Sequence, residues 1–185
     1  MSAQDDYPLI EATLRGDVEA FGVLVERYQK PLFSAASRIT GNREDALEAT
    51  QTAFLKAYDK LGTFDSAHRF FSWIFRIVVN ESLDIARQRR RFVDESAERA
   101  DRPSADDPEA DYSSVQDAAR VRRALARLPP DHRVVIVLRH FHELSYGEMA
   151  EVIGIPEKTV KSRLWSARRE LRELLGVNAS ERNTV

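Results

Sequence analysis

The chain has no cysteine in its 185 residues, and it has only seven glycines and seven prolines. Without cysteine it can form neither a disulfide framework nor a cysteine-ligated zinc finger, and it has no cysteine nucleophile. No apolar run is long enough to cross a bilayer, and the polar, acidic start at Met1–Pro8 is unlike a signal peptide. These absences predict a cytoplasmic protein without membrane insertion.

Positive charge is not in overall excess, because 28 Lys and Arg residues face 30 Asp and Glu residues, for a net charge of −2. The two signs are nevertheless segregated along the chain. Acidic residues dominate 94–111, whereas arginines gather just before this stretch (87–91) and basic residues recur over 158–172. A partner senses charge within about a Debye length, roughly 10 Å, so the basic segments can bind nucleic acid despite the net charge.

The acidic stretch also divides the chain. Residues 93–115 contain Pro103 and Pro108 and almost no apolar residues, which predicts a flexible linker. It separates a first domain, residues 1–92, from a second, residues 116–176, which a tail, 177–185, follows. Apolar residues recur with a helical period on both sides, and no alternating strand pattern is present. The prediction is an all-α protein of two small helical domains, a helical bundle and a helix-turn-helix, joined by the acidic linker.

Helices are expected in the first domain along the stripe Phe21–Leu32, over about 43–61 and over about 69–91. The second of these should bury Ala46, Ala53, Phe54, Ala57, Tyr58 and Leu61. In the second domain the pattern predicts helices at about 116–128, 130–141, 146–153 and 156–175.

A helix-turn-helix is predicted at the end of the second domain. Ser145-Tyr146-Gly147-Glu148 has the pattern of a capping box that starts a short helix. Gly154 suits the left-handed position after that helix, and Pro156 suits the first turn of the next one. A short helix, a glycine turn and a longer basic helix form this DNA-binding motif.

The final helix has two chemically different faces. An apolar stripe, expected to be buried, comprises Val160, Leu164, Ala167, Leu171 and Leu174. The opposite face carries Lys158, Lys161, Ser162, Trp165, Arg168, Arg169 and Arg172. Such a helix can lie in a major groove and contact phosphates and base edges together. An ordinary solvated face is the alternative, but Glu157, Glu170 and Glu173 lie towards the ends of the helix, so DNA binding is favoured.

The aromatic segment from Phe70 to Asn80 leaves two interpretations open. Aromatic residues at helical spacing usually pack in a core. However, Phe70, Phe71, Trp73 and Phe75 cannot all point inward from one helix, and Arg69, Arg76 and Arg87 share its outer surface. Exposed aromatic residues beside arginines can hold single-stranded DNA by stacking.

Two sets of segments resemble a known family. Residues 17–21 (DVEAF), Gln51 with 53–58 (AFLKAY) and 73–80 (WIFRIVVN) resemble region 2 of the extracytoplasmic function (ECF) sigma factors. Leu128-Pro129 and 159–164 (TVKSRL) resemble region 4 of the same family. The resemblance spans nearly the whole chain, with both domains in order and the linker between them.

The resemblance implies a promoter-recognition subunit of RNA polymerase. Its expected partners are the polymerase core, through the β′ clamp helices and the β flap, and promoter DNA. The expected −35 contacts are Lys158, Lys161, Ser162, Trp165 and Arg168. The expected −10 contacts are Phe64, Arg69, Arg76 and Asn80, with Phe64 and Asn80 at a pocket for a flipped base, which needs a stacking surface and a polar reader.

The expected core-binding face lies on the second helix, between Asp45 and Tyr58, and comprises Glu44, Asp45, Glu48, Gln51 and Thr52. Two departures from the family occur there, since relatives usually have acids at the positions of Leu47 and Thr52. A third is Ser166, where many relatives have arginine, so the −35 contacts can differ.

The missing acids suggest regulation by phosphorylation. Glu48 and Thr52 are four residues apart and share a helix face. A phosphate on Thr52 would add about −1.5 to −2 charges there and could bind arginines through charge-assisted hydrogen bonds. A Ser/Thr kinase acting on Thr52, or on Thr50 as second choice, would then switch on core binding. An unmodified, tolerated surface threonine is the alternative, and an anti-sigma factor is the other expected regulator.

No enzyme motif is evident. Serine and histidine occur without a nucleophile elbow, and no P-loop is present. His140 and His142 are two residues apart and point to different helix faces, so neither a metal site nor any cofactor is expected. Two other functions stay open on the residues alone: a helix-turn-helix regulator that acts without polymerase, and a helical adaptor or enzyme with incidental basic helices.

Overall fold

The computed structural model describes residues 6–95 and 112–176, with side chains for 6–92 and 118–176. The described part is all-helical, which confirms the predicted fold class. The helices are α1 (Tyr7–Leu14), α2 (Val18–Thr40), α3 (Arg43–Asp59), the 3-10 turn η2 (Leu61–Thr63) and α4 (Phe70–Glu95), followed by α5 (Tyr112–Arg127), α6 (Pro130–His140), α7 (Tyr146–Ile153) and α8 (Glu157–Leu174). Most of the predicted linker and the whole tail lie outside the described residues. The expected boundaries at 92/93 and 115/116 fall within α4 and α5.

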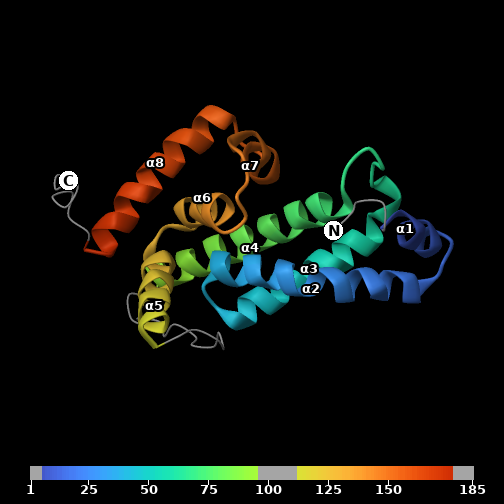
Figure 1. Ribbon diagram of the computed structural model, residues 1–185, viewed down its shortest axis with the longest axis horizontal. Coiled ribbons are helices and arrows are strands. Elements are labelled where there is room, and N and C mark those ends of the chain that lie inside the picture. Colours follow the sequence, from blue (N-terminus) through green and yellow to red (C-terminus); the bar gives the residue numbers. More distant parts are fainter. Residues whose placement is uncertain (1–5, 96–111, 177–185) are drawn as a thin grey trace.

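Helices α2, α3 and α4 form the N-terminal bundle (Figure 1). The side chains of Asp17 and Asn42 cap α2 and α3 by accepting hydrogen bonds from the amides of Ala20 (3.2 Å) and Asp45 (3.0 Å). Between these helices Gly41 ends α2 with a φ of +73°, in the left-handed region that glycine adopts without strain. The buried face of α3 is largely alanine, which allows α2 and α4 to pack closely against it.

Helix α1 was not predicted, because it is short and its apolar residues do not form a long stripe. It is fixed to the bundle by Asp6, the buried residue before its first turn. The Asp6 carboxylate accepts hydrogen bonds from Arg27 (2.5 Å) and from the hydroxyl of Tyr28 (2.6 Å). Burial, followed by the nearby carboxylate, raises the pKa of Tyr28 to about 12. A distant acid therefore anchors this helix, and local periodicity does not reveal it.

The aromatic residues at the start of α4 pack inside the bundle. Phe70 and Phe75 are buried, and Phe71 and Trp73 are half-buried. Phe71 packs against Tyr28 (5.4 Å between ring centres) and Trp73 packs against Phe70 (5.8 Å). All four side chains are thus covered at least in part, which favours the core interpretation over an exposed stacking surface. Tyr58 is a correction to the sequence prediction, because it is exposed rather than buried.

The C-terminal domain follows the predicted motif closely. Ser145 and Glu148 form the capping box of α7, and Gly154 ends that helix with a φ of +75°. Pro156 lies one residue before α8 as its cap, rather than within its first turn. The α8 residues Val160, Leu164 and Ala167 are buried, whereas Leu171 and Leu174 are half-buried.

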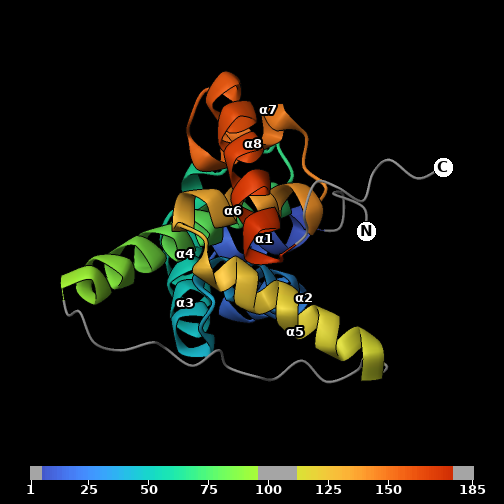
Figure 2. The same ribbon diagram turned by 90° about the vertical axis from the view of Figure 1, so that its left-hand side faces the viewer.

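Helix α6 lies between the two domains. It packs against α7 and α8 on its own side and against α2 and α4 of the bundle, while α7 also contacts α4. Five consecutive residues, Val134–Leu138, are buried, as in a helix that is covered all round. Figure 1 shows α8 at the edge of the molecule with α6 between it and α2, and in Figure 2, turned by 90°, α7 and the start of α8 project above the N-terminal bundle.

Candidate nucleic-acid interface

The outward face of α8 carries the predicted −35 residues. Lys158, Lys161, Ser162, Trp165 and Arg168 are all exposed. Buried Val160, Leu164 and Ala167 hold the opposite side of the helix against the domain. A rigid helix thus presents cationic, hydroxyl and indole groups together on one accessible surface, as contact with a major groove requires.

Lys161 is positioned by two neighbours. Its ammonium lies 2.6 Å from a carboxylate oxygen of Glu157 and 5.4 Å from the ring centre of Tyr146. The hydrogen bond to Glu157 raises the pKa of Lys161, so the side chain stays cationic. Exposed ion pairs of this kind are weak, so a DNA phosphate or base edge can displace the glutamate.

Trp165 and Arg168 also have neighbours on this surface. The Trp165 side chain is 62% exposed, with the guanidinium of Arg169 5.2 Å from its ring centre. Arg168 lies 3.4 Å from Nε2 of His140. Burial first, then Arg168 and Arg139, lower the pKa of His140, so the imidazole is neutral near Arg168 at neutral pH.

The predicted −10 residues lie along one side of α4 and in the loop before it. Phe64 is half-buried and packs against Phe70 (5.7 Å) and Trp73 (5.4 Å). Trp73, Arg76 and Asn80 recur at i, i+3 and i+7, so they share a helix face. Arg69 and Arg76 are exposed and Asn80 is half-buried. Phe64 thus packs against Trp73, the first residue of this α4 face. The polar side chain of Asn80 lies on the same face, two helical turns further along.

The predicted core-binding residues of α3 divide into two groups. Glu44, Glu48 and Gln51 are exposed, whereas Asp45 and Thr52 are half-buried at the side facing α4. Asp45 forms an ion pair with Arg89 of α4 at 2.7 Å, and Lys56 forms one with Glu81 of α4 at 2.6 Å. Thr52 lies between these ion pairs along the helix, so it borders the outward face rather than occupying its centre.

The structure argues against Thr50, the second-choice phosphorylation site. It is 6% exposed, and its hydroxyl donates a hydrogen bond to the carbonyl of Ala46 at 2.7 Å. A kinase needs the free hydroxyl oxygen, which the α2–α3 packing covers in the folded protein.

The sequence prediction missed an apolar component of the α3 surface. Leu47, Leu55 and Tyr58 are exposed on it, with Leu55 68% exposed. Together with Gln51 they recur at i, i+4, i+8 and i+11, a spacing that places them on one face. This spacing was present in the sequence and could have identified the apolar surface. However, a buried helix face has the same spacing, so the sequence alone did not distinguish the two.

Two protein-family models match this chain, one in each of its domains. Residues 24–92 match the family model of sigma-70 region 2, and residues 118–171 match that of sigma-70 region 4. The chain is 34% identical to the RNA polymerase sigma-H factor of Pseudomonas aeruginosa, over 95% of this chain and 96% of that one. It is 37% identical to the ECF sigma factor SigM of Mycobacterium tuberculosis, over 94% of this chain and 86% of that one.

The chain is an ECF sigma factor. Two solved structures agree with this assignment. One is the sigma factor RpoE in complex with the anti-sigma factor NepR from Bartonella quintana, with a TM-score of 0.68 and 29% identity over 85% of this chain and 98% of that chain. The other is CnrH in complex with the cytosolic domain of CnrY, with a TM-score of 0.66 and 30% identity over 96% of this chain and all of that one.

As an ECF sigma factor, the protein directs promoter-specific transcription initiation as a non-enzymatic subunit of RNA polymerase. This excludes the adaptor, the enzyme and the polymerase-independent regulator. The bundle of α2, α3 and α4 is region 2, and the helix-turn-helix domain is region 4. Among the residues that the structure describes, no helix combines the length and hydropathy needed to cross a bilayer.

Proposed function

We propose that this ECF sigma factor reads the −35 element with Lys158, Lys161, Ser162, Trp165 and Arg168, and the −10 element with Phe64, Arg69, Arg76 and Asn80. The carrying observation is the α8 surface, where every member of the −35 set is exposed on a helix whose other side is buried. Lys161 and Arg168 supply cations for phosphates or guanine edges, and Trp165 supplies an apolar surface for a thymine methyl group.

At the −10 element, Asn80 reads the edge of a flipped base and Phe64 covers the base face. The half-buried ring of Phe64 is held by Phe70 and Trp73. A preformed aromatic wall limits the conformational entropy lost when the base binds. Arg69 and Arg76, both exposed, contact the surrounding phosphates.

Run-off transcription with core polymerase tests these assignments. Asn80→Ala should retain core binding but impair opening, visible as weaker permanganate reactivity of −10 thymines. Ser72→Ala is the matched control, because Ser72 is an exposed polar residue on the same helix. Melting of the −10 region by Asn80→Ala at the wild-type level would show that the base pocket lies elsewhere.

The outward face of α3 is the proposed docking surface for the β′ clamp helices, and region 4 is proposed to contact the β flap. Glu44, Glu48 and Gln51 are accessible on α3, next to the exposed Leu55. An acidic and apolar surface fits a basic, amphipathic helical partner. We place the protein in the cytoplasm, where the polymerase works, and an anti-sigma factor among its regulators, since RpoE of Bartonella quintana binds one.

Phosphorylation of Thr52 is the second proposed regulator. Its half-buried position leaves the hydroxyl at the margin of α3, one turn from the exposed Glu48. A phosphate would extend the negative charge of the docking surface and strengthen binding to a basic partner. Lys56 lies four residues after Thr52 on the same helix face. Its ammonium would therefore offset part of the negative charge that a phosphate on Thr52 adds.

The test compares core affinity of the unmodified protein with that of protein phosphorylated at Thr52, using Thr52→Val as the isosteric variant that cannot be modified. Thr52→Glu should recover part of the gain, because it supplies less charge than a phosphate. Thr50→Val is the matched control, since its hydroxyl is buried. Equal core affinity with and without phosphate would contradict the proposal.

A further inference from the structure

Glu157 is the only acid among residues 157–169, the part of α8 that carries the proposed −35 contacts. It is exposed and is the first residue of the helix. With Lys161, Trp165 and Arg168 it recurs at i, i+4, i+8 and i+11, so it shares their outward face. The N-terminal residues of a recognition helix are those that contact base edges. Glu157 therefore lies where bases are read, although its charge repels DNA phosphates.

Two neighbours hold the Lys161 ammonium in place. It lies 2.6 Å from Oε1 of Glu157 on its own helix and 5.4 Å from the ring centre of Tyr146 on α7. The half-buried Tyr146 ring also has the guanidinium of Arg139 5.4 Å from its centre. Arg139 is fixed in turn, because it donates a hydrogen bond to the carbonyl of Leu144 at 2.9 Å. The Glu157–Lys161 pair is thus ordered before DNA binds, which lowers the entropy lost on binding.

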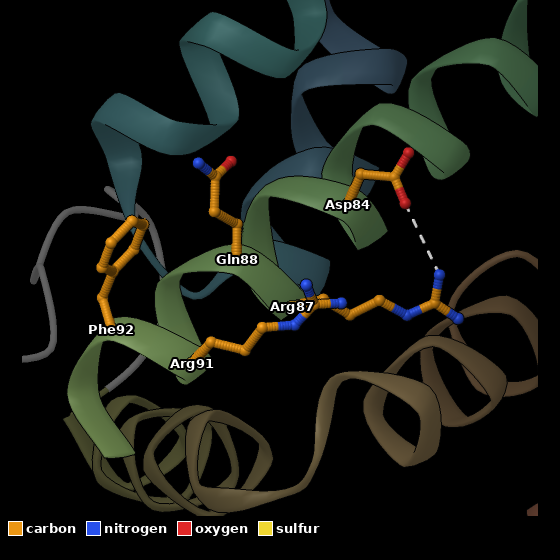
Figure 3. Close-up of a pocket in the computed structure, with 5 residues that line it drawn as sticks. All are labelled: Asp84, Arg87, Gln88, Arg91 and Phe92. Atoms are coloured by element: carbon orange, nitrogen blue, oxygen red, sulfur yellow. Dashed lines mark hydrogen bonds and ion pairs between the residues drawn. The ribbon is translucent and has the colours of Figure 1, made fainter. Parts of the chain in front are cut away.

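Arg163, the next cation after Lys161 on α8, faces the other way. Its guanidinium is 3.2 Å from Asp131 of α6, and the same carboxylate accepts a hydrogen bond from Arg87 of α4 at 2.7 Å. Figure 3 shows Arg87 at a hollow of about 500 Å³, with Asp84 on its other side. These charges neutralise one another on the inner side of α8. Glu157 and Lys161 therefore form a separate pair on the outward face.

The polar ends of Glu157 and Lys161 converge. One turn of an α-helix advances about 5.4 Å, whereas the ammonium and the carboxylate are only 2.6 Å apart. Successive base pairs are about 3.4 Å apart, so the two groups reach the same base pair or adjacent ones. The ammonium only donates hydrogen bonds and the carboxylate only accepts them. The pair thus presents a donor beside an acceptor to the edge of the groove.

The major groove offers few partners for the Glu157 carboxylate. The donors there are the N4 amino group of cytosine and the N6 amino group of adenine, whereas guanine presents two acceptors and thymine an acceptor and a methyl group. When Lys161 donates to O6 or N7 of guanine, its bond to Glu157 weakens, and the carboxylate needs another donor. A cytosine or adenine edge supplies one. A guanine or thymine edge leaves a desolvated charge unpaired, which is costly.

We propose that Glu157 is a specificity-determining residue of −35 recognition. Its carboxylate accepts a hydrogen bond from the amino group of a cytosine or adenine, while Lys161 donates to a guanine in the same or the adjacent base pair. The proposal rests on the −35 assignment above and deepens it. Repulsion between Glu157 and phosphates weakens binding to DNA in general, and the amino group offsets this loss only at the correct sequence. The acid thus selects against wrong sites as well as for the right one.

Selection from random duplex DNA tests the proposal. Polymerase core loaded with wild type or with Glu157→Gln selects from the same pool, and the bound sequences are counted. The wild type should prefer cytosine or adenine at one position of the −35 element, at or beside a preferred guanine. In Glu157→Gln this preference should fall about tenfold, because the amide can donate as well as accept. The preferences at other positions should stay unchanged.

Glu173→Gln is the matched control. Glu173 is an exposed acid near the other end of α8, and it lies 4.0 Å from Arg169, four residues away. Both variants remove one negative charge, so both should raise affinity for an unrelated duplex to a similar degree. Only Glu157→Gln should change a base preference.

A selective wild type with the same base preferences in Glu157→Gln would overturn the proposal and leave the −35 assignment intact. A wild type without any −35 preference would contradict that assignment, and the proposal with it. The double variant Glu157→Gln, Lys161→Ala gives a second measurement. If the two side chains read as one unit, Glu157→Gln should have a smaller effect on base preference when Lys161 is already alanine. An equal effect in both backgrounds would overturn the shared reading.

Discussion

Helices α8 and α3 each present one face to solvent, and the two faces differ in chemistry. The α8 surface combines Lys161, Arg168 and Trp165, whereas the α3 surface combines Glu48 with the apolar Leu55. Cations on a helix suit the phosphates and base edges of DNA. Acids around apolar side chains suit a protein surface. The two helices have similar lengths. The side chains at a few exposed positions thus fit them to different partners.

Trp165→Ala and Lys161→Ala, which change the α8 surface, should have the largest effect, and it should be on promoter affinity. Each removes a proposed base contact, so promoter affinity should fall by about 1–3 kcal/mol for a base-reading residue and by less for a phosphate contact. Promoter binding by holoenzyme measures the loss. Lys30→Ala is the matched control, because it removes an exposed lysine from the other domain. Wild-type affinity in both variants would place the recognition surface elsewhere.

Leu55→Ala should weaken core binding by about 1 kcal/mol, because it truncates the most exposed apolar side chain of the α3 surface. The salt dependence of core binding should stay unchanged, since no charge is lost. Lys161→Ala should instead lower the salt slope of DNA binding by about one if it contacts a phosphate. Titrations at several salt concentrations compare the two, with the exposed Leu14→Ala as control. A changed salt slope for Leu55→Ala would contradict the apolar role.

Mild acid should produce the smallest effect and should act on region 4 before region 2. Burial, then nearby arginines, lower the pKa values of His140 and His142. Below about pH 6.5 the unfolded chain takes up protons that the folded domain does not, so the stability present above that pH is lost as pH falls.

Hydrogen exchange at pH 7.5 and pH 5.5, corrected for the intrinsic exchange rate at each pH, measures this. On going to pH 5.5, protection should fall more in α6 and α7 than in α2 and α3. The double variant His140→Gln, His142→Gln should lose most of the difference. An equal fall of protection in both domains would contradict the assignment to these histidines.

Elements that depend on local chemistry were predictable from the sequence. Ser145 and Glu148 define the start of α7 because the capping box uses neighbouring backbone atoms, and Gly154 ends it through its own φ. The exposed set on α8 followed from the helical period, since the apolar stripe identifies its buried side. The site residues of α8 were therefore predictable as a surface, although their contacts with DNA stay a prediction.

Features that depend on distant partners were not predictable. Asp6 anchors α1 through Arg27 and Tyr28, more than twenty residues away. Arg133 caps a helix that ends more than ninety residues earlier in the chain. Periodicity assigns a face to each helix but does not identify what covers it, which also explains the errors at Thr50 and Tyr58. The continuous apolar run Val134–Leu138 was the one available signal that both sides of α6 are covered.

The two tryptophans of the chain lie one in each domain. Trp73 is half-buried against Phe64 and Phe70, whereas Trp165 stands in solvent on α8. Indole emission shifts to longer wavelength in water, so the two residues have separable spectra in the native protein. Trp73→Phe and Trp165→Phe would each leave one optical reporter, the former following −35 contact and the latter −10 contact. Contacts of the free protein with −35 DNA and with −10 DNA can thus be followed separately without an added dye.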